Sequence, residues 1–273
     1  MSQALQRPQQ DTWNASVYGQ FLEARTRPAR DLLFAISPDF HPKAVCDLGC
    51  GPGNSTILLQ ERWPEATVVG MDTSSSMLVE AKKKYPDIEF IQGDIATWAP
   101  EEKIDCLFAN AALQWVSNHE TLFPKLTSYL RPGGIFAMQI PNNFHTPSHQ
   151  TTVRLLQTHS EWHPFLSGVR YGLLETPFYT AATYYDLGVK AGLTNLLLWE
   201  TEYFQEMQDH QSIFNWVKGT GLQPVLSQMD SDTKSKFERA YVEAIRSEYP
   251  IQRNGNVLLP FRRLFLVGCR PSS

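Results

Sequence analysis

The segment DLGCGPG at residues 47–53 limits the possible fold more than any other part of the chain. It overlaps the short apolar run at 44–48, which is typical of a buried parallel strand that enters a turn. Glycines at alternate positions allow a tight turn and let a ligand approach where a Cβ would collide. The segment therefore predicts a strand, a ligand-binding turn and a helix in immediate succession.

Strand-like and helix-like patterns alternate from residue 43 to residue 141. The expected strands are at 44–48, 67–72, 88–94, 104–110 and 134–141, and the expected helices at 55–62, 75–85 and 119–134. Two later strands, at 196–204 and 264–269, bring the total to seven. This alternation predicts an α/β fold with a doubly wound, mostly parallel sheet of seven strands.

The regions outside that alternation predict a single domain, 1–273, with helical cap insertions. Residues 1–12 form a polar tail, and 13–34 have helical periodicity in which Pro28 suits the first turn of a second helix. Residues 43–141 are the expected cofactor-binding core. Residues 142–180 and 205–258 are expected to be insertions that cover the substrate.

The charge balance argues against several classes of partner. With 24 basic and 28 acidic residues the formal charge is −4, which disfavours nonspecific binding to nucleic acid or to an anionic membrane. No apolar run approaches the ~18 residues that a membrane span needs. The N-terminus has no apolar stretch typical of a signal peptide, and the 4 cysteines suit reduced thiols. We therefore expect a cytoplasmic monomer that acts on a small molecule.

The spacing of the glycine segment separates it from a dinucleotide site. A dinucleotide fingerprint is G-x-G-x-x-G, whereas here the spacing is G-x-G-x-G, preceded by Asp47. Asp47 would repel a phosphate, and Pro52 removes an N–H that a phosphate would need. Asp72 ends the second strand, where an acidic residue can accept the hydroxyls of a ribose. Asp94 follows the third strand, and we place it beside an adenine amino group.

This combination resembles the class I S-adenosylmethionine (SAM)-dependent methyltransferases, which have a Rossmann-like fold. The resemblance covers about residues 43–141 and implies SAM as cofactor and S-adenosylhomocysteine (SAH) as product. An arginine of the N-terminal helix would hold the SAM carboxylate, and a tyrosine would close over its sulfonium. The expected cofactor-binding residues are Tyr18, Arg27, Asp47, Gly49, Cys50, Gly51, Gly53, Asp72, Asp94, Ile95, Asn110, Ala111, Gln114 and Trp115.

More segments resemble small-acid carboxyl methyltransferases, and most of them are similar to the trans-aconitate methyltransferase family. These segments are WNASVY at 13–18, EARTRPARDLL at 23–33, NAALQW at 110–115, WVKGTGLQP at 216–224 and LLPFRRLF at 258–265. The resemblance implies O-methylation of a carboxylate of trans-aconitate. Three alternatives stay open: a malonyl-carrier-protein carboxyl methyltransferase, an enzyme for another small acid, and a noncatalytic SAM-binding module.

A carboxylate substrate explains why the sequence offers no convincing general base. A carboxyl group of pKa ~4 is ionised at neutral pH, so its oxygen is already a nucleophile. We therefore assign no catalytic residue, and we expect no metal. The protein must instead hold the other carboxylates of a tricarboxylate. The candidates for substrate binding are Trp13, Arg25, Asn142, His145, Trp216, Arg262 and Arg263. We place Arg262 and Arg263 just before the last strand.

Overall fold

In the computed structural model of the chain, which describes residues 22–168, 180–219 and 221–272, seven strands form one sheet in the order β3-β2-β1-β4-β5-β7-β6. The strands are β1 Ala44–Leu48, β2 Thr67–Asp72, β3 Glu89–Gln92, β4 Ile104–Asn110, β5 Leu130–Pro141, β6 Thr194–Met207 and β7 Val257–Cys269. Neighbours among β1–β5 are parallel, whereas β7 is antiparallel to both β5 and β6. The predicted doubly wound, mostly parallel sheet of seven strands is confirmed.

Helices cover both faces of the parallel strands. The helical elements are α2 Leu22–Phe34, α3 Asn54–Arg62, α4 Ser75–Lys84, η1 Leu113–Trp115, α5 His119–Ser128, α6 Pro147–Thr158, η2 His163–Gly168, α7 Ala181–Lys190, α8 His210–Lys218, α9 Gln223–Leu226 and α10 Ser231–Ile245. Apolar residues of α2 and α3 pack on one face, with Leu32 and Leu59 fully buried there. Leu122 and Phe123 of α5 and Tyr184 of α7 pack on the other face. The parallel strands are therefore buried on both sides, as their apolar sequences require.

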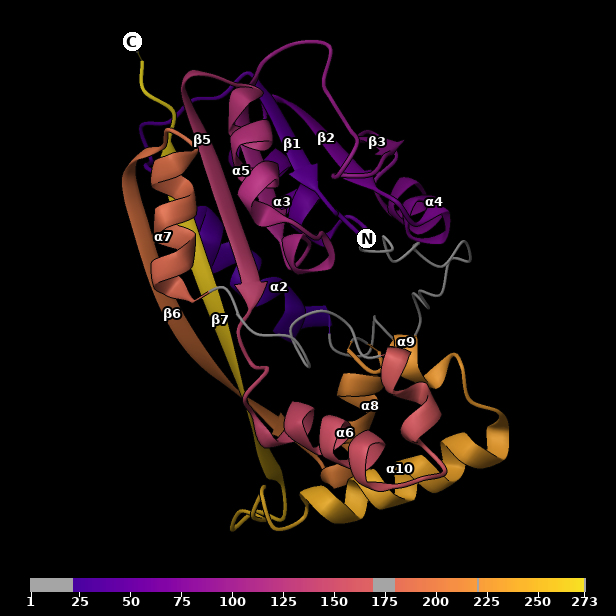
Figure 1. Ribbon diagram of the computed structural model, residues 1–273. Coiled ribbons are helices and arrows are strands. Elements are labelled where there is room, and N and C mark those ends of the chain that lie inside the picture. The colour runs from indigo at the N-terminus through magenta and orange to yellow at the C-terminus, as the bar shows by residue number, and fades with distance from the viewer. Residues whose placement is uncertain (1–21, 169–179, 220, 273) are drawn as a thin grey trace, which may run out of the picture.

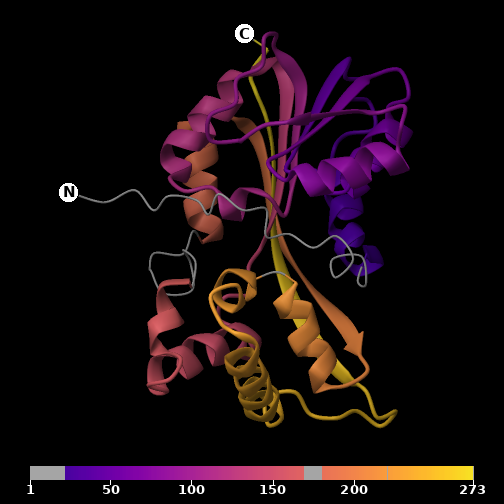
Figure 2. The same cartoon turned by 90° about the vertical axis from the view of Figure 1, so that its right-hand side faces the viewer.

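A second apolar core lies beyond the carboxyl end of β5. Strands β6 and β7 have 14 and 13 residues, against 5 in β1, and so extend past the parallel strands. Helices α6, α8 and α10 pack around these extensions with Met207 and Phe261 in the same buried cluster. Figures 1 and 2 show this helical layer below the sheet, on the side to which the arrowhead of β5 points. The layer therefore faces the end of the sheet where ligands bind in open α/β folds.

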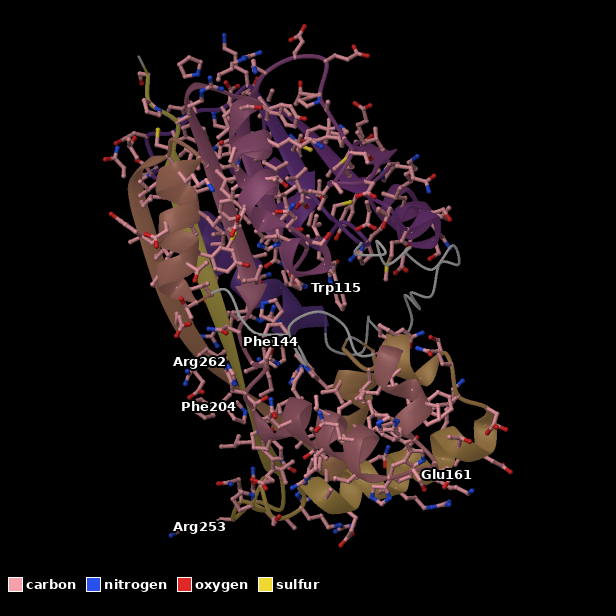
Figure 3. All side chains as sticks on the ribbon, in the orientation of Figure 1. Trp115, Phe144, Glu161, Phe204, Arg253 and Arg262 are labelled. Atoms are coloured by element: carbon pink, nitrogen blue, oxygen red, sulfur yellow. The ribbon has the colours of Figure 1, made fainter. Side chains whose placement is uncertain are left out.

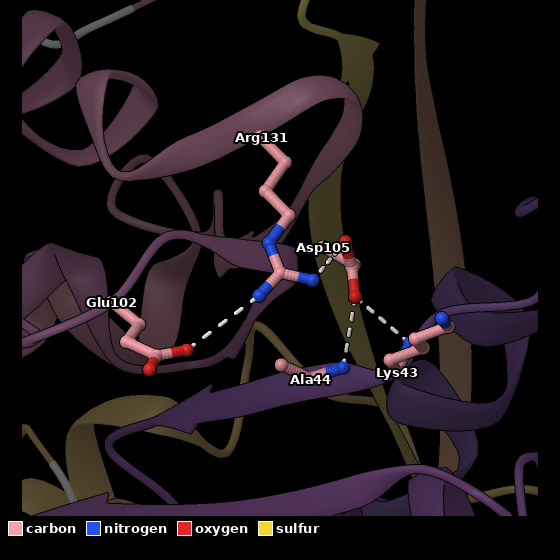
Figure 4. A network of polar contacts seen from close by, with 5 residues as sticks. All are labelled: Lys43, Ala44, Glu102, Asp105 and Arg131. Atoms are coloured by element: carbon pink, nitrogen blue, oxygen red, sulfur yellow. Dashed lines mark hydrogen bonds and ion pairs between the residues drawn. The ribbon is translucent and has the colours of Figure 1, made fainter.

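A polar network holds the opposite end of the sheet (Figure 4). The Asp105 carboxylate accepts hydrogen bonds from the backbone amides of Lys43 and Ala44 at 2.8 and 2.9 Å. Arg131 lies 3.5 Å from Asp105 and 3.8 Å from Glu102. The network joins the amino-terminal ends of β1, β4 and β5, at the opposite end of the sheet from the proposed site.

The largest differences from the expected element boundaries concern β5, α2 and the two long strands β6 and β7. Residues 130–133 belong to β5 rather than to the preceding helix, because Leu130 pairs with Ile104 in the sheet. Pro28 lies inside α2 instead of starting a helix. A proline inside a helix costs about 3 kcal/mol, which burial of Ala29, Leu32 and Leu33 on the sheet offsets.

The third difference concerns the two long strands. β6 runs from Thr194 to Met207, and β7 begins at Val257, seven residues before the expected start at Leu264. The residues that extend β7 pair with β6, and Met207 itself is the partner of Val257.

Among the described helices, none is both long enough and apolar enough to cross a membrane.

Candidate functional site

The backbone amides of the glycine loop are already committed within the protein. The N–H groups of Gly49 and Cys50 donate to the Met71 carbonyl at 2.7 and 3.0 Å. The Gly51 N–H donates to the Asp72 carboxylate at 2.8 Å, and the Gly53 N–H donates to the Cys50 carbonyl at 3.1 Å. Since Pro52 has no N–H, the loop has no spare donor with which to cradle a phosphate. This agrees with the expectation of a ligand without phosphate.

The glycines of the loop differ in how much free space surrounds them, and the free space indicates where a ligand can approach. A Cβ on Gly49 would lie 2.4 Å from the Ala112 Cβ, so this glycine lets the loop pack against the turn after β4. Gly51 has φ +55°, and no described atom lies within 4 Å of the place where its Cβ would be. Gly51 therefore presents open backbone beside the end of β2, as close approach of a ligand requires.

Asp47 lies beneath the loop and not on its open surface. Its side chain is fully buried, and Oδ2 accepts hydrogen bonds from the hydroxyls of Ser55 and Thr56, both at 2.7 Å. Oδ1 has no hydrogen-bond partner among the described residues. Burial raises the pKa of Asp47 to about 6, although the two hydroxyl hydrogen bonds oppose that rise. Asp47 thus ties the loop to α3 and adds negative charge below it.

The predicted ribose and adenine residues lie at the ends of β2 and β3. The Asp72 carboxylate is half-buried and accepts from the backbone amides of Gly51 and Ser74. A carboxylate accepts hydrogen bonds from hydroxyl groups, so Asp72 stays a candidate for the ribose. The Asp94 carboxylate accepts the amide of Ala96 at 2.8 Å, and Ile95 packs beside Gly49. The structure therefore brings these two loops together at the glycine segment.

The turn after β4 carries two buried acceptors. Asn110 Oδ1 and Gln114 Oε1 are both buried without a hydrogen-bond partner in the described part of the chain. Between them, Ala111 has φ +53°, a conformation unusual for a residue with a side chain. Its carbonyl accepts the Gln114 amide at 2.7 Å. Unsatisfied oxygens at such a turn suit a cationic donor such as an ammonium group.

Trp115 and Phe144 are candidates for an aromatic wall of the site. Trp115 is half-buried at the end of η1. Figure 3 shows Trp115 and Phe144 on the side of the sheet that faces helix α6. This placement fits a wall between the sheet and the helical layer.

Several expected residues at the N-terminus cannot be placed. Trp13, Tyr18 and the side chain of Arg25 lie outside the described residues. Arg27 is exposed on α2, with its guanidinium 5.5 Å from the centre of the Tyr203 ring on β6. The contact recorded for Arg27 is thus with β6, and its role toward SAM stays a prediction.

The two C-terminal arginines lie inside β7, and the expectation that they precede the strand was wrong. Consecutive strand residues point to opposite faces, so the two have different surroundings. Arg262 is exposed and lies 3.5 Å from Glu202, whereas Arg263 is 5 % exposed and donates to Gln139 Oε1 at 3.3 Å. Of the two, only Arg263 has the buried surroundings of a substrate clamp.

The other proposed substrate residues are dispersed. The Asn142 amide donates to Glu200 at 2.5 Å, and His145 is exposed. Trp216 is 2 % exposed and packs edge-on against Phe261 in the core of the helical layer. Core packing therefore accounts for Trp216.

Sequence reasoning missed two polar residues near the end of β5, the buried Gln139 and the half-buried His149. Gln139 is fully buried within the strand, and a polar residue inside the apolar run GIFAMQIP was a signal that could have identified it. His149 lies in the first turn of α6 beside Asn143 and Thr146. Burial lowers the pKa of His149 to about 4, so it is neutral at pH 7. No sequence pattern pointed to His149.

Comparison with known proteins decides the family. A family model described as a methyltransferase domain matches residues 45–134. A trans-aconitate 2-methyltransferase of Azoarcus sp. (strain BH72) is 44 % identical over 95 % of this chain and 99 % of its own length. One of Klebsiella pneumoniae (strain 342) is 43 % identical over 93 % and 96 %. The chain belongs to the trans-aconitate 2-methyltransferase family.

Solved structures of more distant methyltransferases have the same fold. A putative methyltransferase of Bacillus halodurans aligns with a TM-score of 0.56 at 11 % identity, covering 90 % of this chain and 99 % of that one. A phosphoethanolamine N-methyltransferase of Haemonchus contortus, solved with SAM, gives 0.55 at 14 % identity, covering 90 % and 52 %. At such identities the likeness to these structures extends to the fold alone. Membership of the trans-aconitate 2-methyltransferase family rests on the full-length relatives.

Proposed function

We propose that this chain transfers a methyl group from SAM to a carboxylate of trans-aconitate, which gives the monomethyl ester and SAH. The observation that carries the proposal is the likeness to trans-aconitate 2-methyltransferases over almost the whole of both chains. That likeness includes the helical layer and the extended β6 and β7, where substrate specificity is expected. It therefore supports the substrate as well as the cofactor.

The residues at the carboxyl ends of β1, β2 and β4 fit SAM. The loop at Gly51 is open and has no spare amide for a phosphate, and the Asp72 carboxylate lies beside it at the end of β2. The unsatisfied oxygens of Asn110 and Gln114 suit the ammonium of the methionyl part. Residues 43–141 would then hold the cofactor, while 142–180 and 205–258 would cover the substrate.

The proposed reaction needs no proton transfer by a side chain of the protein. When bound, SAM supplies an electrophilic methyl group on a sulfonium sulfur. A carboxylate oxygen of the substrate forms a bond to that methyl carbon, and the electron pair of the breaking carbon–sulfur bond stays on sulfur. No proton moves, so no general base is needed. The chain's contribution is to orient the carboxylate and to replace part of its hydration shell.

The proposal also covers the setting in which the enzyme works. We place the enzyme as a cytoplasmic monomer that acts on a small acid. Its formal charge of −4 disfavours nucleic acid and anionic membranes as partners.

The experiment is to incubate the protein with SAM and trans-aconitate and to analyse the products by mass spectrometry. Equal amounts of SAH and a base-labile monomethyl ester support the proposal. Formation of SAH without an ester of the acid contradicts it.

A further inference from the structure

Gln139 and Arg263 lie together at the carboxyl end of the sheet, on the face that α2 covers. On β5, Gln139 follows Ile135 and Ala137 at alternate positions, and both belong to the core shared with α2. On β7, Arg263 occupies the same face as Phe265 of that core. Exposure is 0 % for Gln139 and 5 % for Arg263. A buried amide and a buried guanidinium are thus adjacent.

A hydrogen bond between them fixes the direction of the amide. The Arg263 guanidinium donates to Gln139 Oε1 at 3.3 Å. The amide nitrogen therefore points away from the guanidinium, and it has no hydrogen-bond partner within the described ranges. Leaving such a donor unsatisfied in the interior destabilises the folded protein, because the donor has lost its hydrogen bonds to water. Native structures seldom carry this cost without a ligand, a water or a function to explain it.

The same corner of the sheet adjoins the turn after β4. Gln139 is the register partner of Asn110, and its carbonyl accepts the Ala111 N–H at 2.8 Å. Neighbouring strands lie about 4.8 Å apart. The unsatisfied amide therefore lies one strand away from the residues to which we assign the methionyl part of SAM. A group bound at Gln139 is close to the place where the methyl is transferred.

The two donors together suit an anion with planar oxygens. A guanidinium presents a fork of N–H groups that matches a carboxylate, and the amide adds a neutral donor beside it. The Arg263 guanidinium carbon lies 4.4 Å from the centre of the Phe261 ring, a cation–π contact that favours this position of the guanidinium. Neither a sugar nor an apolar group would use a buried cation in this way.

We propose that Gln139 and Arg263 bind a carboxylate of the substrate that is not methylated, with the Gln139 amide nitrogen as a specificity-determining donor. The inference rests on the proposed function and adds a residue to it. Binding one carboxylate here places a second carboxylate of the same small acid toward the Asn110 turn. The enzyme thereby selects acids with at least two carboxylates and fixes which one reacts.

The test compares Gln139→Met and Gln139→Glu with the wild type. Methionine removes the donor at similar volume, and glutamate adds a charge that pairs with Arg263 and repels the acid. We expect KM for trans-aconitate to rise about tenfold for methionine and about a hundredfold for glutamate. The Kd for SAH and the unfolding temperature should stay close to the wild-type values. Gln228→Glu makes the same chemical change at an exposed position of the helical layer and should leave KM unchanged.

A second readout separates this inference from the proposed function. Tricarballylate, a saturated tricarboxylate, is titrated calorimetrically into the SAH complex of each variant. Binding by the wild type that both Gln139 variants weaken supports the site, whatever acid turns over. Unchanged tricarballylate binding and unchanged KM in both variants overturn it. Equal losses of SAH binding, acid binding and thermal stability also overturn it, since they indicate a purely structural role.

Discussion

The Asp72 carboxylate accepts a hydrogen bond from the Gly51 amide at 2.8 Å, which ties the end of β2 to the glycine loop. The other oxygen accepts the amide of Ser74 at 2.9 Å, at the N-cap of α4. One side chain therefore sets the relative positions of two segments of the proposed SAM site. We expect the same carboxylate to accept the ribose hydroxyls of SAM.

Replacing Asp72 with alanine should weaken SAM binding about tenfold or more, because the ribose loses its acceptor and the loop loses its tie. Calorimetric titration with SAH measures the effect without turnover. Asp87→Ala removes an exposed carboxylate just before β3 and serves as the control. If SAH affinity were the same in Asp72→Ala as in the control, the cofactor would be wrongly placed.

Gly51 and Gly255 form a matched pair for the close-approach argument. Both have positive φ, +55° and +86°, with no described atom near the position of a Cβ. Alanine at either position should cost roughly 1–2 kcal/mol of unfolding free energy, since both adopt the left-handed conformation. Only Gly51→Ala should also reduce the thermal stabilisation that SAH gives. Similar SAH shifts for the two variants would mean that no ligand approaches Gly51.

Buried Asp47 should make cofactor affinity depend on pH. Its pKa is about 6 in the ligand-free protein, above the ordinary value of 3.8, because burial disfavours the ionised form. SAM carries a net positive charge and prefers ionised Asp47, so SAM affinity should fall as pH drops below about 6, by at most tenfold per pH unit. Asp47→Asn should abolish this dependence. A wild-type affinity that stays level from pH 7 to pH 5 would contradict the prediction.

The same raised pKa has a consequence for stability. The folded protein binds this proton more tightly than the unfolded chain does. The resulting stabilisation is complete below about pH 3.8 and is lost as pH rises through about 6. Asp47→Asn should therefore flatten the change in unfolding free energy between pH 4 and pH 6, as measured by urea denaturation. An unaltered profile would show that Asp47 does not titrate in this range.

The two arginines of β7 provide another paired test. Arg263→Lys keeps the charge but loses the fork, so KM for trans-aconitate should rise about tenfold. Arg262→Lys makes the same change on the opposite face, where the side chain is exposed beside Glu202, and KM should change little. Steady-state kinetics at saturating SAM distinguish the two. A larger rise in KM for Arg262→Lys than for Arg263→Lys would indicate that the substrate binds on the other face of the sheet.

The sequence predicted the elements whose apolar runs end in a clear turn. The expected limits of β1, β2 and β4 agree with the structure because each strand is buried on both faces and followed by a turn. Ser74 lies just before the expected helix at 75–85, and its hydroxyl accepts the Met77 amide as an N-cap does. Local pattern was sufficient in these places because burial and turn chemistry agree.

Where tertiary contacts decided, the local pattern failed. Leu130 belongs to a strand because it pairs with Ile104, and the extended β7 exists because β6 lies beside it. The role of Gln139 depends on Arg263, 124 positions away, and no motif links the two. Most of the proposed cofactor residues lie within 43–141, where one run of strands and turns suggested them from the sequence. The proposed pairing of Gln139 with Arg263 joins two distant strands, and only the structure brought it to light.

Methylation of trans-aconitate by this protein is measured by methyl transfer from isotopically labelled SAM. Trans-aconitate, cis-aconitate, citrate, isocitrate and malonyl-carrier protein are offered separately, and kcat/KM is measured for each. We expect the highest kcat/KM for trans-aconitate, with label recovered in a base-labile ester. SAM binding without transfer to any of these acids, or a preference for the carrier protein, would contradict the proposed function.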